Sequence, residues 1–119
     1  MSPVLIHIRD LIFSSKVVAT ARAEGVEFKV VRDASKLLET PAERLLVDLN
    51  ADGALEAAVE WKARFQGHVT GFCSHIAVPT INAAREAGID RVMSNGAFSS
   101  QLPQILREAG SSQASDLEG

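Results

Sequence analysis

The sequence has little of several features that define specialised classes of protein. Its 119 residues include one cysteine, four prolines and eight glycines. A single cysteine cannot form an intramolecular disulfide or a cysteine-rich zinc site, so a small disulfide-stapled domain is excluded. So few glycines and prolines exclude a collagen-like or low-complexity chain. Because 46% of the residues are hydrophobic, we expect one packed domain of ordinary size.

Excess charge and long apolar runs are also lacking. Twelve Lys and Arg against 15 Asp and Glu give a net charge of -3, and the basic residues are scattered singly, so no basic stripe points to nucleic acid. No segment approaches the roughly 20 apolar residues of a membrane span, and the N-terminus does not resemble a signal peptide. We therefore expect a cytoplasmic protein that binds neither nucleic acid nor a membrane.

Hydrophobic patterning along the chain alternates between two kinds of segment. Short apolar or alternating runs predict strands at 4–8, 26–31, 45–49, 69–73 and 91–93. Helices are predicted between them, the first capped by Ser14 or Ser15 and the others near 35–39, 54–65, 79–88 and 98–109. Such alternation predicts an α/β fold with a parallel sheet and helices on both faces.

The strand patterns also predict the order of the sheet. The second and fifth strands look like edges, whereas the other three look buried, which favours the order 2-1-3-4-5 of a flavodoxin-like three-layer sandwich. Residues 110–119 are mostly small and polar. We therefore expect a single domain over residues 1–109, followed by a flexible C-terminal tail over 110–119.

Polar side chains follow four of the predicted strands at the carboxyl edge, where such folds bind ligands. They are Asp10, Asp48, Asn50, Cys73, Ser74, His75, Ser94 and Asn95. Asp48 most needs an explanation, because an acid within an apolar central strand costs free energy unless it is paired or used. Together with Asp10 it would supply oxygen ligands for Mg²⁺.

Structural explanations compete with the functional ones. Polar residues end strands in any case, because loops begin there, and Arg9 beside Asp10 would oppose metal binding. We expect Cys73 to be a small buried side chain and His7 to be satisfied within the first strand. His68, which precedes the fourth strand, is expected to be solvated.

Common catalytic and cofactor motifs are absent. The sequence contains no G-x-x-x-x-G-K-S/T, no G-x-G-x-x-G after the first strand, and no H-E-x-x-H, C-x-x-C or G-x-S-x-G. These absences argue against a nucleotide-binding, thioredoxin-like or hydrolase function, and the loop after the first strand lacks the glycine expected around a flavin phosphate.

Two segments resemble the response-regulator receiver domain, the CheY-like phosphoacceptor module of two-component signalling and phosphorelays. They are Leu46-Val47-Asp48-Leu49-Asn50 and Ala83-Ala84-Arg85-Glu86-Ala87-Gly88-Ile89-Asp90-Arg91-Val92. The resemblance implies that Asp48 is the phosphoacceptor and that Asp10, Asp48 and the backbone carbonyl of Asn50 hold Mg²⁺. It also places Cys73 or Ser74 at the switch hydroxyl position and Asn95 at the position of an essential Lys.

Departures from the receiver pattern shape the functional expectation. Arg9-Asp10 replaces an acidic pair, and Asn95-Gly96 replaces Lys-Pro. The resemblance therefore implies an atypical, non-enzymatic, stand-alone receiver that works by docking to a protein such as a histidine kinase or a downstream effector. The face from the fourth strand to the fifth helix is the expected docking surface and a candidate homodimer interface.

A second hypothesis comes from a different class of function. In it, the same carboxyl-edge crevice binds a small molecule or acts as a cryptic enzyme, using Cys73, Ser74, His75 and Asn95 as donors and acceptors. A stabilising metabolite in a thermal-shift screen would favour this hypothesis over the docking protein.

Overall fold

The computed structural model describes residues 3–118 of the chain, with side chains described through residue 109. Within this part, β-strands and α-helices alternate throughout. In chain order they are β1 (Val4–His7), α1 (Leu11–Ala23), β2 (Phe28–Val30), α2 (Ala34–Leu37), β3 (Arg44–Asp48), α3 (Ala54–Phe65), β4 (His68–Cys73), α4 (Val78–Glu86), β5 (Arg91–Ser94) and α5 (Asn95–Glu118).

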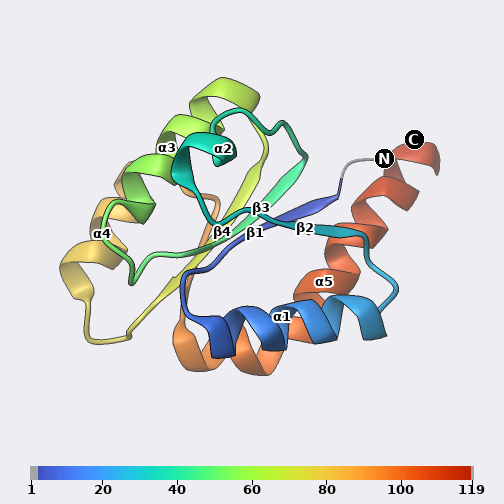
Figure 1. Ribbon diagram of the computed structural model, residues 1–119, viewed down its shortest axis with the longest axis horizontal. Helices are drawn as coiled ribbons and strands as arrows, with labels where there is room; N and C mark the ends of the chain where they lie inside the picture. The colour runs from blue at the N-terminus through green and yellow to red at the C-terminus, as the bar shows by residue number, and fades with distance from the viewer. Residues whose placement is uncertain (1–2, 119) are drawn as a thin grey trace.

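The strands form one parallel five-stranded sheet with the order β2-β1-β3-β4-β5. The predicted strand order and three-layer architecture are therefore confirmed. Figure 1 shows α1 and α5 on one face of the sheet and α2, α3 and α4 on the other. Because the strands are parallel, all their carboxyl ends meet at one edge of the sheet.

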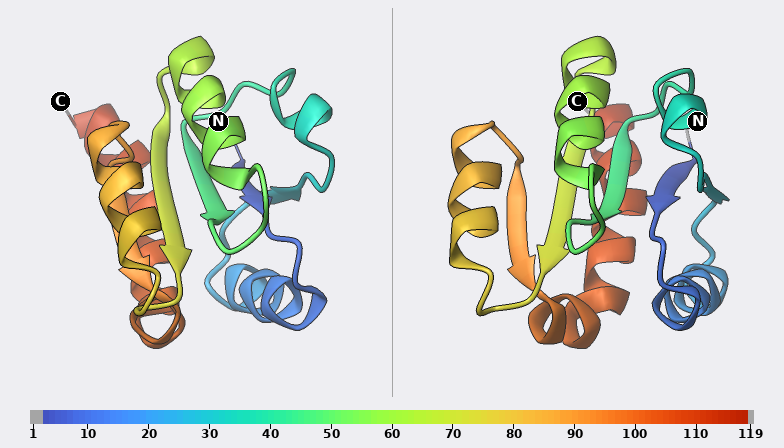
Figure 2. Two further views of the ribbon diagram at one scale, coloured as in Figure 1. Left: turned by 90° about the vertical axis from the view of Figure 1, so that its left-hand side faces the viewer. Right: turned by 60° about the vertical axis from the view of Figure 1, so that its left-hand side comes forward.

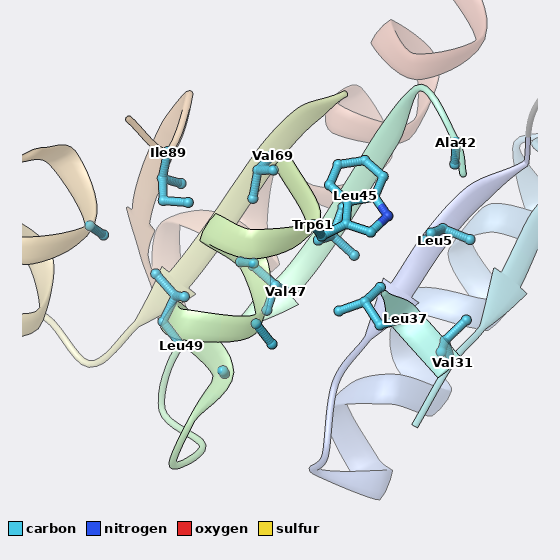
Figure 3. Close-up of a cluster of buried hydrophobic side chains, with 14 of the residues drawn as sticks. Leu5, Val31, Leu37, Ala42, Leu45, Val47, Leu49, Trp61, Val69 and Ile89 are labelled. Atoms are coloured by element: carbon cyan, nitrogen blue, oxygen red, sulfur yellow. The ribbon is translucent and has the colours of Figure 1, made fainter. Parts of the chain in front are cut away.

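Side chains of alternate strand residues pack into two separate hydrophobic layers, one on each face of the sheet. Figure 3 shows the layer beneath α2, α3 and α4, in which Leu5, Leu45 and Val47 pack near Trp61. Trp61 is fully buried, and its Nε1 donates a hydrogen bond to the Thr40 carbonyl at 2.9 Å. On the opposite face, the Phe72 ring stacks on the rings of Phe13 and Phe98, with centroids 4.6 and 4.3 Å away.

A polar cluster closes the amino edge of the sheet. The Lys62 ammonium donates to the Asp90 carboxylate at 2.7 Å and to the Gly67 carbonyl at 3.0 Å, while the same carboxylate accepts from the Val69 amide at 2.8 Å. Although burial alone would raise the pKa of Asp90, these hydrogen bonds hold it below its ordinary value. The cluster ties α3 to β4 and to the segment before β5.

The start of α1 differs from the sequence prediction. The N-cap is Asp10, whose Oδ1 accepts from the Ile12 and Phe13 amides at 2.9 and 3.1 Å. The predicted cap at Ser14 or Ser15 was therefore wrong. A carboxylate at the N-cap accepts hydrogen bonds from free backbone amides and interacts favourably with the positive end of the helix dipole. Helix α1 therefore begins four to five residues earlier than a cap at Ser14 or Ser15 would place it.

The last helix also differs from its predicted bounds. It begins at Asn95 rather than near residue 98, and Pro103 lies inside it. Its backbone remains helical to Glu118, beyond Ala109, where the predicted apolar stripe ends. The flexibility expected for residues 110–119 stays a prediction, and residue 119 lies outside the described residues. No helix in the described part of the chain is long and apolar enough to cross a membrane.

Candidate functional site

Four chain segments gather at the carboxyl edge of the sheet. Figure 2 shows the start of α1, the loop before α3, the loop before α4 and the start of α5 near this edge. The ends of β3, β4 and β5 bring Asp48, Ser74 and Asn95 to it. The structure therefore places these sequence-predicted residues around one location.

Asp48, the last residue of β3, is the buried acid of this site. Only 6% of its surface is exposed. Its Oδ1 accepts two hydrogen bonds from Asn50, from the backbone amide at 2.9 Å and from the side-chain Nδ2 at 2.7 Å. Hydrogen bonds to a buried carboxylate offset the cost of removing its charge from water.

Asn50 connects the ends of three strands through its side-chain amide. In addition to Asp48, its Nδ2 donates to the Asn95 Oδ1 at 3.1 Å, while its own Oδ1 accepts from the Ser74 amide at 2.9 Å. The partners fix the orientation of the amide, because a carboxylate requires a donor and a backbone N–H requires an acceptor. Sequence reasoning assigned Asn50 only a carbonyl role and missed this bridge.

Ser74 is the first residue of the loop between β4 and α4. Within this loop the Ser74 Oγ accepts from the Ile76 amide at 3.4 Å. The side chains of Ile76 and Val78 are 76% and 53% exposed. The bond from Ser74 to Asn50 therefore links the buried acid to a loop that presents two large apolar side chains to solvent.

Cys73 lies in the hydrophobic layer beneath α3 and α4. Its side chain is fully buried, which confirms the expected burial. Burial raises the pKa of its thiol, and the negative charge of Asp48 raises it further. A buried thiol held in its neutral form is a packing group rather than a nucleophile.

The histidines lie in different environments. The Nδ1 of His7 donates to the Val31 carbonyl at 2.7 Å, so His7 is satisfied between strands as predicted. His75 is exposed. His68 is half-buried, so its expected solvated position was wrong. Desolvation lowers the pKa of His68, and the nearby charge of Arg44 lowers it further.

A small cavity of about 140 Å³ lies beside Asp48. The charged side chains among its lining residues are Arg9, Arg32, Asp48 and Asp52, and His7 also lines it. Asp10 does not belong to this lining. Two arginines thus line the same cavity as the acid that the receiver resemblance implies as a phosphoacceptor.

The expected magnesium ligands do not converge on this cavity. Asp10 is exposed and its Oδ1 caps α1, whereas Arg9 and Arg32 supply positive charge that repels a divalent cation. No group of three or more His, Cys, Asp or Glu side chains among the described residues is placed to hold a metal ion. The Mg²⁺ site implied for Asp10, Asp48 and the Asn50 carbonyl therefore stays a prediction.

Sequence comparisons do not assign the chain to a family. No protein-family model matches it, and no curated protein matches it. Comparison with solved structures, by contrast, finds matches over nearly the whole chain.

A CheY-like response-regulator receiver domain protein from Methanospirillum hungatei JF-1 matches with a TM-score of 0.78 at 15% identity, covering 98% of both chains. The receiver domain of NtrX from Brucella abortus matches with a TM-score of 0.75 at 16% identity, covering 89% of this chain and 96% of that one.

A third match is a receiver domain solved with magnesium in its active-site cleft. This domain, from the sensor histidine kinase PA1611 of Pseudomonas aeruginosa PAO1, matches with a TM-score of 0.74 at 14% identity, covering 90% of this chain and 95% of that one. The chain therefore has the CheY-like receiver fold, as the two sequence segments indicated.

Proposed function

We propose that this chain is an atypical receiver-like signalling domain that works by docking to a protein partner and is not an enzyme. The receiver fold supports a signalling role. The observation that carries the proposal is the Asn50 bridge, which joins buried Asp48 to the Ser74 amide at the base of an exposed apolar loop. A change at the acid is thereby communicated to a surface that a partner can contact.

The docking surface that we propose runs from β4 to α5. Large apolar side chains exposed at the start of α4, namely Ile76 and Val78, are characteristic of interaction surfaces. Arg91 braces β5 against α5 by donating to the Gln101 Oε1 at 2.9 Å. A histidine kinase or a downstream effector fits the receiver resemblance, and a second copy of the chain is the homodimer candidate for the same face.

We also propose that docking does not require Mg²⁺-dependent phosphorylation of Asp48. A magnesium ion occupies the cleft of the Pseudomonas aeruginosa domain, but here Arg9 and Arg32 line the cavity beside the acid. Positive charge on these two arginines would disfavour entry of a divalent cation into the cavity. Asp48, whose carboxylate accepts two hydrogen bonds from Asn50, would thus act as a structural anchor, with phosphoacceptor chemistry as the outcome to be tested.

The size of the cavity supports docking over the small-molecule hypothesis. At about 140 Å³ it is smaller than the roughly 300–1,000 Å³ of typical ligand pockets. In addition, Cys73 is turned into the hydrophobic core, which removes one of the four groups that the small-molecule hypothesis uses.

Site-specific photo-crosslinking in the native host tests the docking function. A benzophenone amino acid at position 76 or 78 should give a discrete crosslinked species, whereas the same probe at Glu60, exposed on α3, should not. Replacing Asn50 in the probe-bearing chain by alanine should lower the yield several-fold, because the Ser74 amide loses its partner.

Two results would overturn the proposal. One is the absence of a discrete species at both loop positions. The other is the same species from the probe at Glu60, which would show that the crosslinks do not report a specific face. A crosslink between two copies of the chain would support docking and assign the partner as the homodimer.

A further inference from the structure

The outer side of β2 is an edge of the sheet. In the described part of the chain, β2 pairs with β1 only. The Glu27 carbonyl accepts from the Val4 amide, and the Val31 amide donates to the Ile6 carbonyl, both at 2.9 Å. Because backbone groups alternate in direction along a strand, residues 27, 29 and 31 face β1, and Phe28 and Val30 direct their N–H and C=O groups outward.

An open groove runs along this edge. Its volume is about 970 Å³, and its walls come from α1 and α2 on either side of β2. Figure 1 shows β2 between these two helices. Ser14, Ser15 and Val18 line the α1 side, and α2 is a single short helix of four residues. The groove leaves room for an extended backbone beside β2.

Positive charge dominates the groove. Four basic residues line it, Arg22, Lys29, Arg32 and Lys36, against two acidic residues, Asp33 and Glu39. The Asp33 Oδ1 already accepts from the amide and hydroxyl of Ser35 at 2.9 and 2.8 Å, as the cap of α2. An approaching chain therefore meets mainly cations, which selects for acidic side chains.

The same charges disfavour pairing between two copies of β2. An antiparallel dimer through this edge would bring Lys29 and its basic neighbours from both copies together, and like charges across a strand pair are destabilising. The edge is thus protected against self-association in the way that natural edge strands use lysine. A partner strand with negative charge would be attracted to the same basic residues instead of repelled by them.

We propose that an extended acidic peptide segment of a partner protein adds to the sheet beside β2 as a sixth strand. The outward backbone groups of Phe28 and Val30 would supply the hydrogen bonds, and Lys29 and Lys36 would supply charge complementarity. This mode of strand addition obtains affinity from the main chain and specificity from alternate side chains. It is independent of Asp48 and of the face from β4 to α5.

A fluorescein-labelled hexapeptide of alternating Asp and Val residues is a suitable probe, with binding to the full chain followed by fluorescence anisotropy. We expect saturable binding that weakens as salt is added. The Val30→Pro variant removes one outward N–H at an edge position where proline is tolerated, and it should weaken binding about tenfold, equivalent to about 1.4 kcal/mol.

Charge is tested separately from hydrogen bonding. The double variant Lys29→Glu/Lys36→Glu should also weaken binding about tenfold or more, because two attractions become repulsions. Arg85→Glu, at an exposed position on α4, reverses a single charge away from the groove and should change the Kd less than twofold, whereas Lys29→Glu alone should weaken binding at least threefold.

A modified peptide keeps the test decisive if Val30→Pro does not fold. The same hexapeptide with every internal amide N-methylated retains its charge but cannot donate in a strand pair, and it should not bind. Equal binding of the methylated peptide, or of a Lys-Val hexapeptide, would overturn the proposal. So would sedimentation of the wild-type chain as a dimer that Val30→Pro dissociates, since a second copy would then occupy the edge.

Discussion

The two ends of the sheet are built in contrasting ways. At the amino edge, the indole of Trp61 packs so closely over Gly67 that a Cβ there would clash with the ring and lie 2.8 Å from the Ala42 carbonyl oxygen, and the pair of Lys62 and Asp90 closes the same end. At the carboxyl edge, one asparagine side chain joins three strand ends. Four large apolar side chains remain exposed on the segments around it, Leu11, Ile12, Ile76 and Val78.

This difference suggests that the amino edge contributes mainly to stability and the carboxyl edge mainly to recognition. Close packing at the amino edge leaves no room for rearrangement, because interiors are packed as densely as organic crystals. At the carboxyl edge, the bonds of Asn50 to Ser74 and Asn95 are exposed, and such bonds contribute about 1 kcal/mol each. We therefore expect substitutions at the amino edge to affect mainly the free energy of unfolding, and those at the carboxyl edge to affect mainly local order.

The largest effect is expected for Trp61→Ala. Removing a fully buried indole should lower the free energy of unfolding by about 3–5 kcal/mol, measured by urea denaturation. Trp61→Phe keeps an aromatic ring and loses the hydrogen bond to Thr40, so it should cost less. Equal losses in the two variants would contradict the assignment of this stability to packing.

A smaller effect on stability is expected for Asn50→Ala. Loss of its three side-chain bonds, one of them to the buried Asp48 carboxylate, should lower the free energy of unfolding by about 1–3 kcal/mol. The local effect should be larger, because the Ser74 amide loses its acceptor and should exchange its hydrogen faster. Asn82→Ala, on the exposed face of α4, is the matched control. Unchanged exchange at Ser74 would remove the link between Asp48 and the apolar loop.

The smallest effect is a dependence of stability on pH at the amino edge. Because desolvation and the charge of Arg44 hold the pKa of His68 below its ordinary value of 6.5 in the folded chain, the unfolded chain takes up this proton first as the pH falls. Stability is therefore unaffected by His68 above about pH 6.5 and falls as the pH drops below that value. The fall ends when the pH reaches the pKa of His68 in the folded chain.

Urea denaturation between pH 5 and 8 would measure this dependence. His68→Gln should flatten it, and His75→Gln, at an exposed position, serves as the control. If the dependence persisted unchanged in His68→Gln, another group would be responsible for it.

Local patterns in the sequence predicted the architecture well. The helix over Ala54–Phe65 has the predicted bounds, because its apolar residues recur at helical spacing and a glycine turn precedes it. The order of the strands followed from which runs were continuously apolar. The start of α1 was misplaced because Ser14 and Ser15 are favoured N-cap residues, so the residues before them were interpreted as a loop, whereas Asp10 is the N-cap.

The site was harder to predict because its contacts are long-range. Asn50 reaches Ser74 and Asn95, which are 24 and 45 residues away in the sequence, and no local pattern reports such contacts. The adjacent residues Arg9 and Asp10 indicated the location of the site but not the role of each residue. The structure separates them, since Arg9 lines the cavity of Asp48 and Asp10 caps a helix.

Intact-mass measurement after treatment with acetyl phosphate tests the central claim most directly, that the carboxyl edge anchors a docking loop and is not a Mg²⁺-dependent phosphoacceptor. The wild-type chain and Asp48→Asn would each be incubated with acetyl phosphate, with and without Mg²⁺. We predict no phosphate-sized increase in mass in any sample. An increase that requires Mg²⁺ and is lost in Asp48→Asn would contradict the account and restore Asp48 as a phosphoacceptor.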